Sequence, residues 1–111
     1  MEANEAVAAL GALAQESRLS VFRLLVQRGP DGAAAGEVSE ALGIPPATLS
    51  FHLAQLGHAG LVRSRREGRR IIYSADYDGM QGLMAFLTEK CCQSAPCAPA
   101  RGRASGRARK C

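Results

Sequence analysis

The sequence has no long hydrophobic run. None of its apolar stretches approaches the roughly 18 to 20 residues of a membrane-spanning helix. It also lacks the basic start of a signal peptide, because the first ten residues, MEANEAVAAL, contain two Glu and no Lys or Arg. No internal repeat is present. We therefore expect a cytoplasmic protein that has no membrane partner.

The chain carries little net charge outside its C-terminal tail. The formal charge is +4, but residues 98–111 hold five basic side chains and no acidic one, so the remainder is at about −1. DNA binding therefore cannot be inferred from the total charge and must depend on local placement. Five arginines do fall within eight residues: Arg63, Arg65, Arg66, Arg69 and Arg70.

The length of 111 residues supports one small domain, which tends to be marginally stable when it is alone. With 47% hydrophobic residues, the chain has apolar surface that a homodimer could cover. Residues 98–111 have no apolar periodicity and are rich in Ala, Gly and Arg, so we predict a disordered basic tail. The expected division is a domain at residues 1–97 followed by a tail at residues 98–111.

Apolar spacing predicts helices at about residues 4–14, 16–28, 34–42 and 47–57, with a last helix that begins near Asp76 or Asp78. Gly29-Pro30 and Gly43 should end the second and third helices, and Pro45-Pro46 should open the fourth. Between the fourth and the last helix, LVRSRR and RIIYSA alternate like strands and are joined at Glu67-Gly68.

The apolar positions of each helix predict its buried side. We expect one stripe on the first helix at Val7, Leu10, Leu13 and Ala14, and an inward face on the second at Leu19, Phe22, Leu25 and Val26. For the fourth helix the expected buried residues are Leu49, Leu53 and Leu56. The last helix has Met80, Leu83, Met84 and Leu87 at helical spacing, and Cys91 would continue that stripe.

Two helices joined by a tight turn with glycine, followed by a basic hairpin, are typical of a winged helix-turn-helix. The predicted fold class is therefore α+β, mainly α, with a two-stranded wing. In this fold the second helix of the pair enters the major groove of DNA, and arginines of the wing neutralise phosphates. We expect double-stranded operator DNA as the partner.

Small and polar side chains lie opposite the leucines of the fourth helix, and this arrangement permits close approach to base edges. Each residue alone also fits a solvated or packing role, but the helix pair, the spacing and the basic hairpin together favour DNA binding. The predicted DNA-binding residues are Thr48, Ser50, Phe51, His52, Gln55, Arg65, Arg66, Arg69 and Arg70.

The segments ESRLSVFRLL and ATLSFHLAQLGHAGLVRSRREGRRIIYSA, with the helix that follows, resemble the ArsR/SmtB family of metalloregulatory repressors. The resemblance covers roughly residues 4–97. It implies a homodimer paired through N- and C-terminal dimerisation helices, which represses transcription until an effector binds. Phe51 departs from the family pattern, where that position is usually polar, and could pack against a thymine methyl group.

The four cysteines all lie in the last 21 residues, and three of them form CCQSAPC. Cytosolic thiols stay reduced, so these residues are more typical of ligands or sensors than of disulfides. Thiolates favour soft ions, and three sulfurs without His or carboxylate suit trivalent arsenic or antimony. The arrangement resembles arsenic regulators that carry a vicinal cysteine pair and a nearby third cysteine. We predict that Cys91, Cys92 and Cys97 bind As(III) or Sb(III), with no permanent cofactor.

Other interpretations of the cysteines stay open. Cys91 could be a small core residue, and the scaffold could instead sense redox state, bind zinc with the help of Cys111 or a partner ligand, or lack an effector. Cys97 and Arg103 also match the C-x5-R pattern of a phosphate-binding loop. That loop needs a preceding strand and a following helix, which the tail does not predict, so we expect no enzyme activity.

Overall fold

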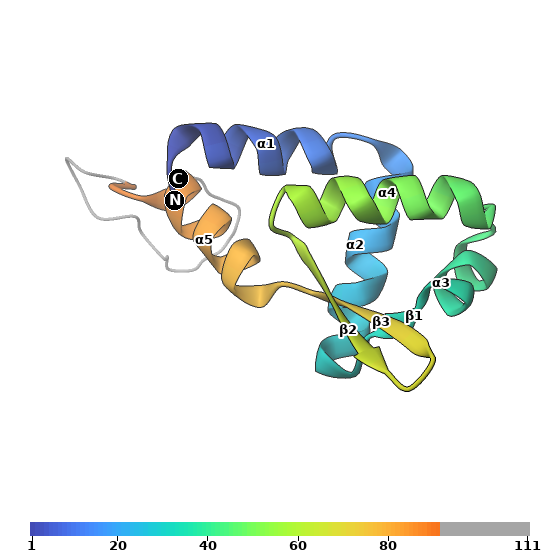
Figure 1. Cartoon of the computed structure of the whole chain (residues 1–111). Helices are drawn as coiled ribbons and strands as arrows, with labels where there is room; N and C mark the ends of the chain where they lie inside the picture. The colour runs from blue at the N-terminus through green and yellow to red at the C-terminus, as the bar shows by residue number, and fades with distance from the viewer. Residues whose placement is uncertain (92–111) are drawn as a thin grey trace, which may run out of the picture.

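The computed structural model describes residues 1–91. In chain order the elements are α1 (Ala3–Leu13), α2 (Glu16–Arg28), the 3-10 turn η1 (Gly29–Asp31), β1 (Ala33–Ala34), α3 (Ala35–Leu42), α4 (Pro46–His58), β2 (Val62–Glu67), β3 (Arg70–Ala75) and α5 (Tyr77–Thr88). Figure 1 shows the small sheet at one edge of the helices, with the hairpin of β2 and β3 projecting from it. The predicted helices and strands are confirmed to within two residues, except at the end of α5. Within residues 1–91, no helix is long and apolar enough to cross a membrane.

The core forms where α4 lies across α2 (Figure 1). Leu49, Leu53 and Leu56 of α4 are buried, as predicted, and they join a cluster that includes Val21 and Leu25 of α2. Burial of a leucine side chain contributes about 1.5–3 kcal/mol, so this face fixes how α4 is rotated about its axis. This rotation also determines which side of α4 remains in solvent.

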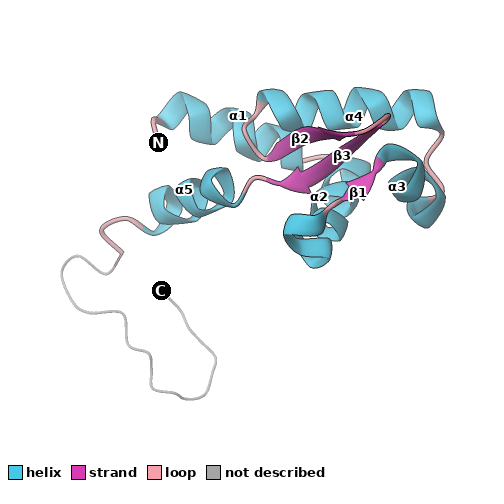
Figure 2. Ribbon diagram, turned by 60° about the horizontal axis from the view of Figure 1, so that its bottom comes forward, coloured by secondary structure: helices cyan, strands magenta, loops and turns pink. Residues whose placement is uncertain are grey.

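The sheet has three antiparallel strands in the order β1-β3-β2. The predicted two-stranded wing is confirmed in the hairpin of β2 and β3. The sequence did not indicate the third strand, β1, in which Ala33 pairs with Tyr73 and Ala34 with Ile72. Two alanines are too short a run to show a period of two, which is why the sequence did not indicate β1. The pairing connects the wing to the segment between α2 and α3 (Figure 2).

Of the stripe expected on α1, Leu13 packs half-buried against the core, whereas the other three residues are exposed. Val7 is 68% exposed and Leu10 is 42% exposed, whereas the buried residues are Ala6, Ala9 and Ala12. Small alanines allow α1 to lie close to the other helices, and the larger residues face outward. The inward prediction for Leu19 is also wrong, because that side chain is 43% exposed.

Helix α5 begins at a side-chain cap, as predicted, and ends earlier than the sequence indicated. Asp76 accepts a hydrogen bond from the backbone N–H of Gly79 at 3.1 Å. The last helical residue is Thr88, since Glu89 is extended and Lys90 has φ of +61°. Cys91 therefore does not continue the helical stripe, and this expectation is corrected.

The start of α5 lies against the turn that follows α4. The backbone N–H of Asp76 donates to the carbonyl oxygen of Leu61 at 2.8 Å. A Cβ atom at Gly79 would collide with the carbonyl oxygen of Gly60, so only glycine permits this approach. The contact joins the last helix directly to the segment that leaves α4.

Substitution of Gly79 by alanine should therefore weaken the fold, because a backbone group must move to accept the methyl group. We expect Gly79→Ala to lower the free energy of unfolding by about 1–3 kcal/mol, as overpacking does. Gly82→Ala is the matched control in the same helix, because its Cβ would meet only the flexible end of Met1 at 3.5 Å. That control should be neutral or up to about 1 kcal/mol more stable. Urea unfolding curves measure both changes, and equal effects would contradict the role of Gly79.

Candidate nucleic-acid interface

The exposed face of α4 presents mainly small and polar side chains. Because Pro45 and Pro46 begin the helix and its leucines are buried, the opposite side is left in solvent. Phe51 is 57% exposed, an unusual position for a large aromatic ring, and Gln55 is half-buried beside this face. The exposed residues are Ala47, Thr48, Ser50, Phe51 and Ala54. The predicted outward orientation is confirmed, and contact with DNA bases stays a prediction.

His52 lies in the interior instead of on this face, with 7% of its surface exposed. Its Nδ1 atom is 3.5 Å from a guanidinium nitrogen of Arg18 in α2. The Nε atom of Arg18 also donates to the carbonyl oxygen of Ala12 at 2.7 Å, at the end of α1. This geometry favours a packing role for His52, in which Arg18 connects α1 to the buried side of α4.

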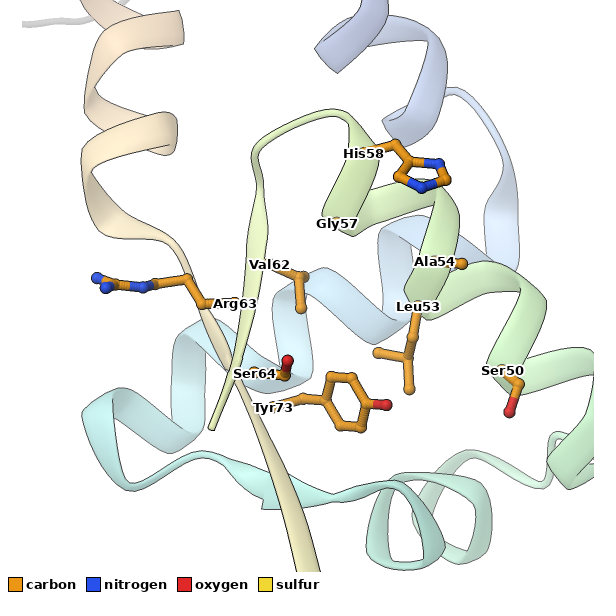
Figure 3. Close-up of a pocket in the computed structure, with 9 residues that line it drawn as sticks. All are labelled: Ser50, Leu53, Ala54, Gly57, His58, Val62, Arg63, Ser64 and Tyr73. Atoms are coloured by element: carbon orange, nitrogen blue, oxygen red, sulfur yellow. The ribbon is translucent and has the colours of Figure 1, made fainter. Parts of the chain in front are cut away.

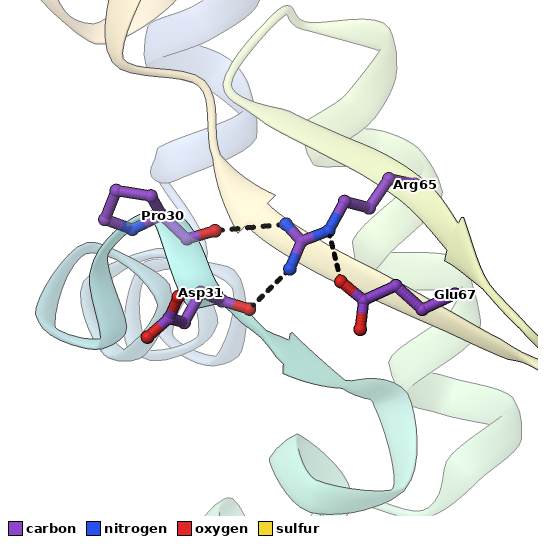
Figure 4. Close-up of polar contacts among 4 residues, drawn as sticks. All are labelled: Pro30, Asp31, Arg65 and Glu67. Atoms are coloured by element: carbon purple, nitrogen blue, oxygen red, sulfur yellow. Dashed lines mark hydrogen bonds and ion pairs between the residues drawn. The ribbon is translucent and has the colours of Figure 1, made fainter.

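Arg65 is held by groups of the chain itself (Figure 4). Its terminal nitrogens donate to the carbonyl oxygens of Pro30 and Asp31, each at 3.0 Å, and its Nε is 2.9 Å from Glu67. Two of its N–H groups therefore hold β2 against η1, and the third pairs with Glu67 of the same strand. We expect Arg65 to position the wing and not to neutralise a phosphate.

Arg70 also has an internal partner, since it lies 3.3 Å from Glu37 at the start of α3. The backbone N–H of Ala34 donates to Glu37 at 2.8 Å. This hydrogen bond, together with the positive charges of Arg70 and Arg28, holds the pKa of Glu37 below its ordinary value. Glu37 therefore stays ionised and connects the wing to the helix-turn-helix.

The other wing arginines are available to DNA. Arg66 and Arg69 lie at the tip of the hairpin, and Arg63 is nearer α5. All three are exposed, and none forms an ion pair with another residue of the described chain, 1–91. Of the four wing arginines predicted to bind DNA, Arg66 and Arg69 best fit that role.

Ser64 and Tyr73 belong to this surface and were missed from the sequence. They are opposite each other on β2 and β3, beside the exposed face of α4. The register of the hairpin could have indicated this pair. Glu67 pairs with Arg70 next to the turn, so the residues three positions further from the turn on each strand, Ser64 and Tyr73, also pair. The turn lies at Gly68-Arg69, one residue later than the predicted Glu67-Gly68.

The structure describes only one of the three predicted thiol ligands. Cys91 is exposed and lies three residues beyond the end of α5. Cys92 and Cys97, like Cys111 and the tail, lie outside the described residues. Within residues 1–91, no three His, Cys, Asp or Glu side chains come together as a potential metal site. Binding of As(III) or Sb(III) therefore stays a prediction.

Large apolar side chains of α1 and α5 are exposed. Met84 and Leu87 of α5 are 53% and 55% exposed, and Val7 and Leu10 of α1 are also in solvent. The two helices contact each other within the chain. These four residues, named the α1/α5 apolar face from here on, are unusual for a surface that remains in water.

The two groups of arginines should differ in how their loss changes salt dependence. Each phosphate neutralised by the protein adds about 0.9 to the slope of log affinity against log salt concentration. We expect Arg66→Ala and Arg69→Ala each to reduce that slope by about this amount, whereas Arg65→Ala weakens binding without changing it. Fluorescence anisotropy of labelled duplex DNA at several salt concentrations measures the slope. An equal reduction for Arg65→Ala would show that it contacts a phosphate.

The fold and this surface define a winged helix-turn-helix DNA-binding domain. Residues 13–65 match the family model described as a helix-turn-helix domain.

The transcriptional activator HlyU of Vibrio cholerae is 32% identical over 96 residues, which are 85% of this chain and 86% of HlyU. A solved HlyU structure has a TM-score of 0.64 at 33% identity, covering 84% of this chain and all of that one. A structure of reduced HlyU also matches, with 31% identity and a TM-score of 0.63 over 81% of this chain and 92% of that one.

Two further solved structures are informative. The homodimeric winged helix-turn-helix domain of Mb0332 from Mycobacterium bovis, described as a possible ArsR-family regulator, is 29% identical with a TM-score of 0.64, covering 78% of this chain and 81% of that one. A possible transcriptional regulator for arsenical resistance is 26% identical with a TM-score of 0.63, covering 71% and 79%. The chain belongs to the ArsR family of winged helix-turn-helix transcriptional regulators, and it is a DNA-binding regulator of transcription.

Proposed function

We propose that this regulator is a homodimeric repressor that leaves its operator when trivalent arsenic or antimony binds Cys91, Cys92 and Cys97. The observation that carries the proposal is the position of Cys91, directly after the helix that bears half of the α1/α5 apolar face. An ion bound there acts at the end of the helix through which the two subunits would pair.

The α1/α5 apolar face supports the homodimer. Val7, Leu10, Met84 and Leu87 expose apolar area on two helices that contact each other, and a second copy would cover it. The relative Mb0332 is described as homodimeric. A symmetric dimer presents two α4 helices, which match two half-sites about one turn of DNA apart.

The end of α5 suits a site built from adjacent cysteines. Neighbouring residues of a helix point about 100° apart, which would keep Cys91 and Cys92 from a common ion. Because α5 ends at Thr88 and Lys90 has a positive φ, Cys91 is not part of the helix, and helical geometry does not fix its direction. Three thiolates without an oxygen or nitrogen ligand match a soft trivalent ion. The similarity to a protein described as a possible transcriptional regulator for arsenical resistance supports this choice of effector.

The contact between α5 and α4 supplies a route for the response. Asp76 and Gly79 hold the start of α5 against Leu61 and Gly60, directly after α4. An ion that changes how α5 packs in the dimer would therefore change the spacing of the two α4 helices. A coupling of about 1–3 kcal/mol, common for allosteric proteins, would weaken operator binding about 5- to 150-fold.

Arsenite should release the reduced protein from labelled DNA taken from the region upstream of its own gene. We expect the anisotropy to fall as about one ion per subunit binds. Cys91→Ser, Cys92→Ser and Cys97→Ser should each keep DNA affinity and lose the response, because each removes one of three ligands. Cys111→Ser is the control and should respond like the wild type. Arsenite that leaves DNA affinity unchanged would exclude the proposed effector.

A thiol-based redox sensor is the second candidate, because the matched protein HlyU was solved in a form described as reduced. In this case oxidation of a cysteine after α5, in place of ion binding, would lower the affinity for DNA. Peroxide would then release the DNA, a reductant would restore binding, and arsenite would have no effect. The same anisotropy measurement with both reagents separates the two candidates. HlyU is named an activator, so a reporter gene also has to show whether transcription rises or falls on release.

A further inference from the structure

An open cleft of about 250 Å³ separates the exposed face of α4 from the hairpin of β2 and β3. Its polar lining comes from both sides: Ser50 projects from α4, and Ser64 and Tyr73 come from the two strands. Figure 3 shows the Tyr73 ring reaching from β3 toward α4, below Leu53. A water molecule takes up about 30 Å³, so the cleft has room for a hydrated phosphate group.

The hydroxyl groups in this cleft are available for a ligand. Among residues 1–91, the side chains of Ser50, Ser64 and Tyr73 form no hydrogen bond with another group of the chain. Each hydroxyl can donate one hydrogen bond, and a phosphate offers several acceptor oxygens. The cleft has no acidic residue among its lining side chains. Its chemistry therefore suits an anion bound by neutral donors.

The position of the cleft indicates which anion this is. When α4 lies in the major groove and the hairpin reaches the adjacent minor groove, one sugar-phosphate strand has to pass between them, because that strand separates the two grooves. The cleft between α4 and β2 is the space that this strand would enter. Arg63 and His58 also line it, but Figure 3 shows the guanidinium and the imidazole ring directed away from the hydroxyl groups.

We propose that this cleft binds a backbone phosphate of the DNA, with the Tyr73 hydroxyl as the principal donor and Ser64 and Ser50 as further donors. The phosphate is clamped between helix and wing, so it fixes how deeply α4 enters the major groove. The inference rests on DNA binding and is independent of the thiol chemistry proposed above. Tyr73, Ser64 and Ser50 are therefore positioning contacts to the backbone, which carry no sequence preference of their own.

The test compares wild-type protein with Tyr73→Phe, which keeps the ring and removes only the hydroxyl group. We expect about a tenfold loss of affinity for operator and non-specific duplexes alike, the size of one hydrogen bond to a charged group. The salt slope should not change, since an uncharged donor displaces no counterion. Ser64→Ala should act in the same direction. Ser74→Ala, on the opposite face of β3, is the control and should bind like the wild type.

Methylphosphonate substitutions in the DNA identify the contact directly, because each one removes the charged oxygen of a single phosphate. At one phosphate in each half-site, the methylphosphonate should lower the affinity of the wild type. The same methylphosphonate should not lower the affinity of Tyr73→Phe further, so the protein change and the DNA change are not additive. Two results would overturn the proposal: Tyr73→Phe binding like the wild type, or a loss that is additive with every methylphosphonate position. The second would assign the Tyr73 hydroxyl to the fold alone. Either result leaves the arsenite response to be decided by its own experiment.

Discussion

Burial of the leucine face of α4 is the constraint on which the rest of this structure depends. Leu49, Leu53 and Leu56 pack with Val21 and Leu25 of α2, and this packing sets the rotation of α4. A rotation that brought the opposite side inward would bury hydroxyl groups and expose three leucines. Each unsatisfied hydroxyl would cost roughly 1–3 kcal/mol, and each leucine would lose about 1.5–3 kcal/mol. The side of α4 that is predicted to contact DNA is thus selected by the core.

The wing is held in place by strand pairing and by side-chain contacts, so the surface around α4 is largely formed before DNA binds. Strand β1 pairs with β3 and joins the hairpin to the chain between α2 and α3. Next to this pairing, Arg65 donates to the carbonyl oxygens of Pro30 and Asp31, and Arg70 pairs with Glu37. Exposed ion pairs contribute little stability singly. Together with strand pairing they restrict the hairpin to one place, and a preformed surface loses less conformational entropy on binding.

Most of the fold could be predicted from the sequence because its signals are local and strong. Pro45-Pro46 and Gly43 mark helix termini through their backbone conformation, and Asp76 marks one through its capping side chain. The spacing of leucines in α4 predicted its buried face. The outward face of α4 then followed without knowledge of any partner. Ser50 and Phe51, which were predicted to contact DNA, are both exposed on that face.

The remaining features depend on contacts between distant residues, which apolar spacing does not encode. On α1 the sequence marked the larger residues, Val7 and Leu10, but alanines face the core because close helix packing leaves room only for small side chains. His52 has the polarity of a surface residue and is buried beside Arg18, 34 positions away. Arg65 looks like any basic wing residue until its partners in η1 are known. Cys92 and Cys97, which are predicted ligands only, lie outside the described residues.

The same close contacts imply that α4 cannot respond to its surroundings independently of α1 and α5. Asp76 and Gly79 connect the turn after α4 to α5, and Arg18 connects the buried side of α4 to the end of α1. Both connections end on the helices that carry the α1/α5 apolar face. A change in how that face is covered would therefore reach α4 at two points along its length. An effector bound after α5, as proposed above, would not need to approach the DNA, because in the proposed dimer a shift in the balance between two arrangements would be sufficient to change the fit of both α4 helices.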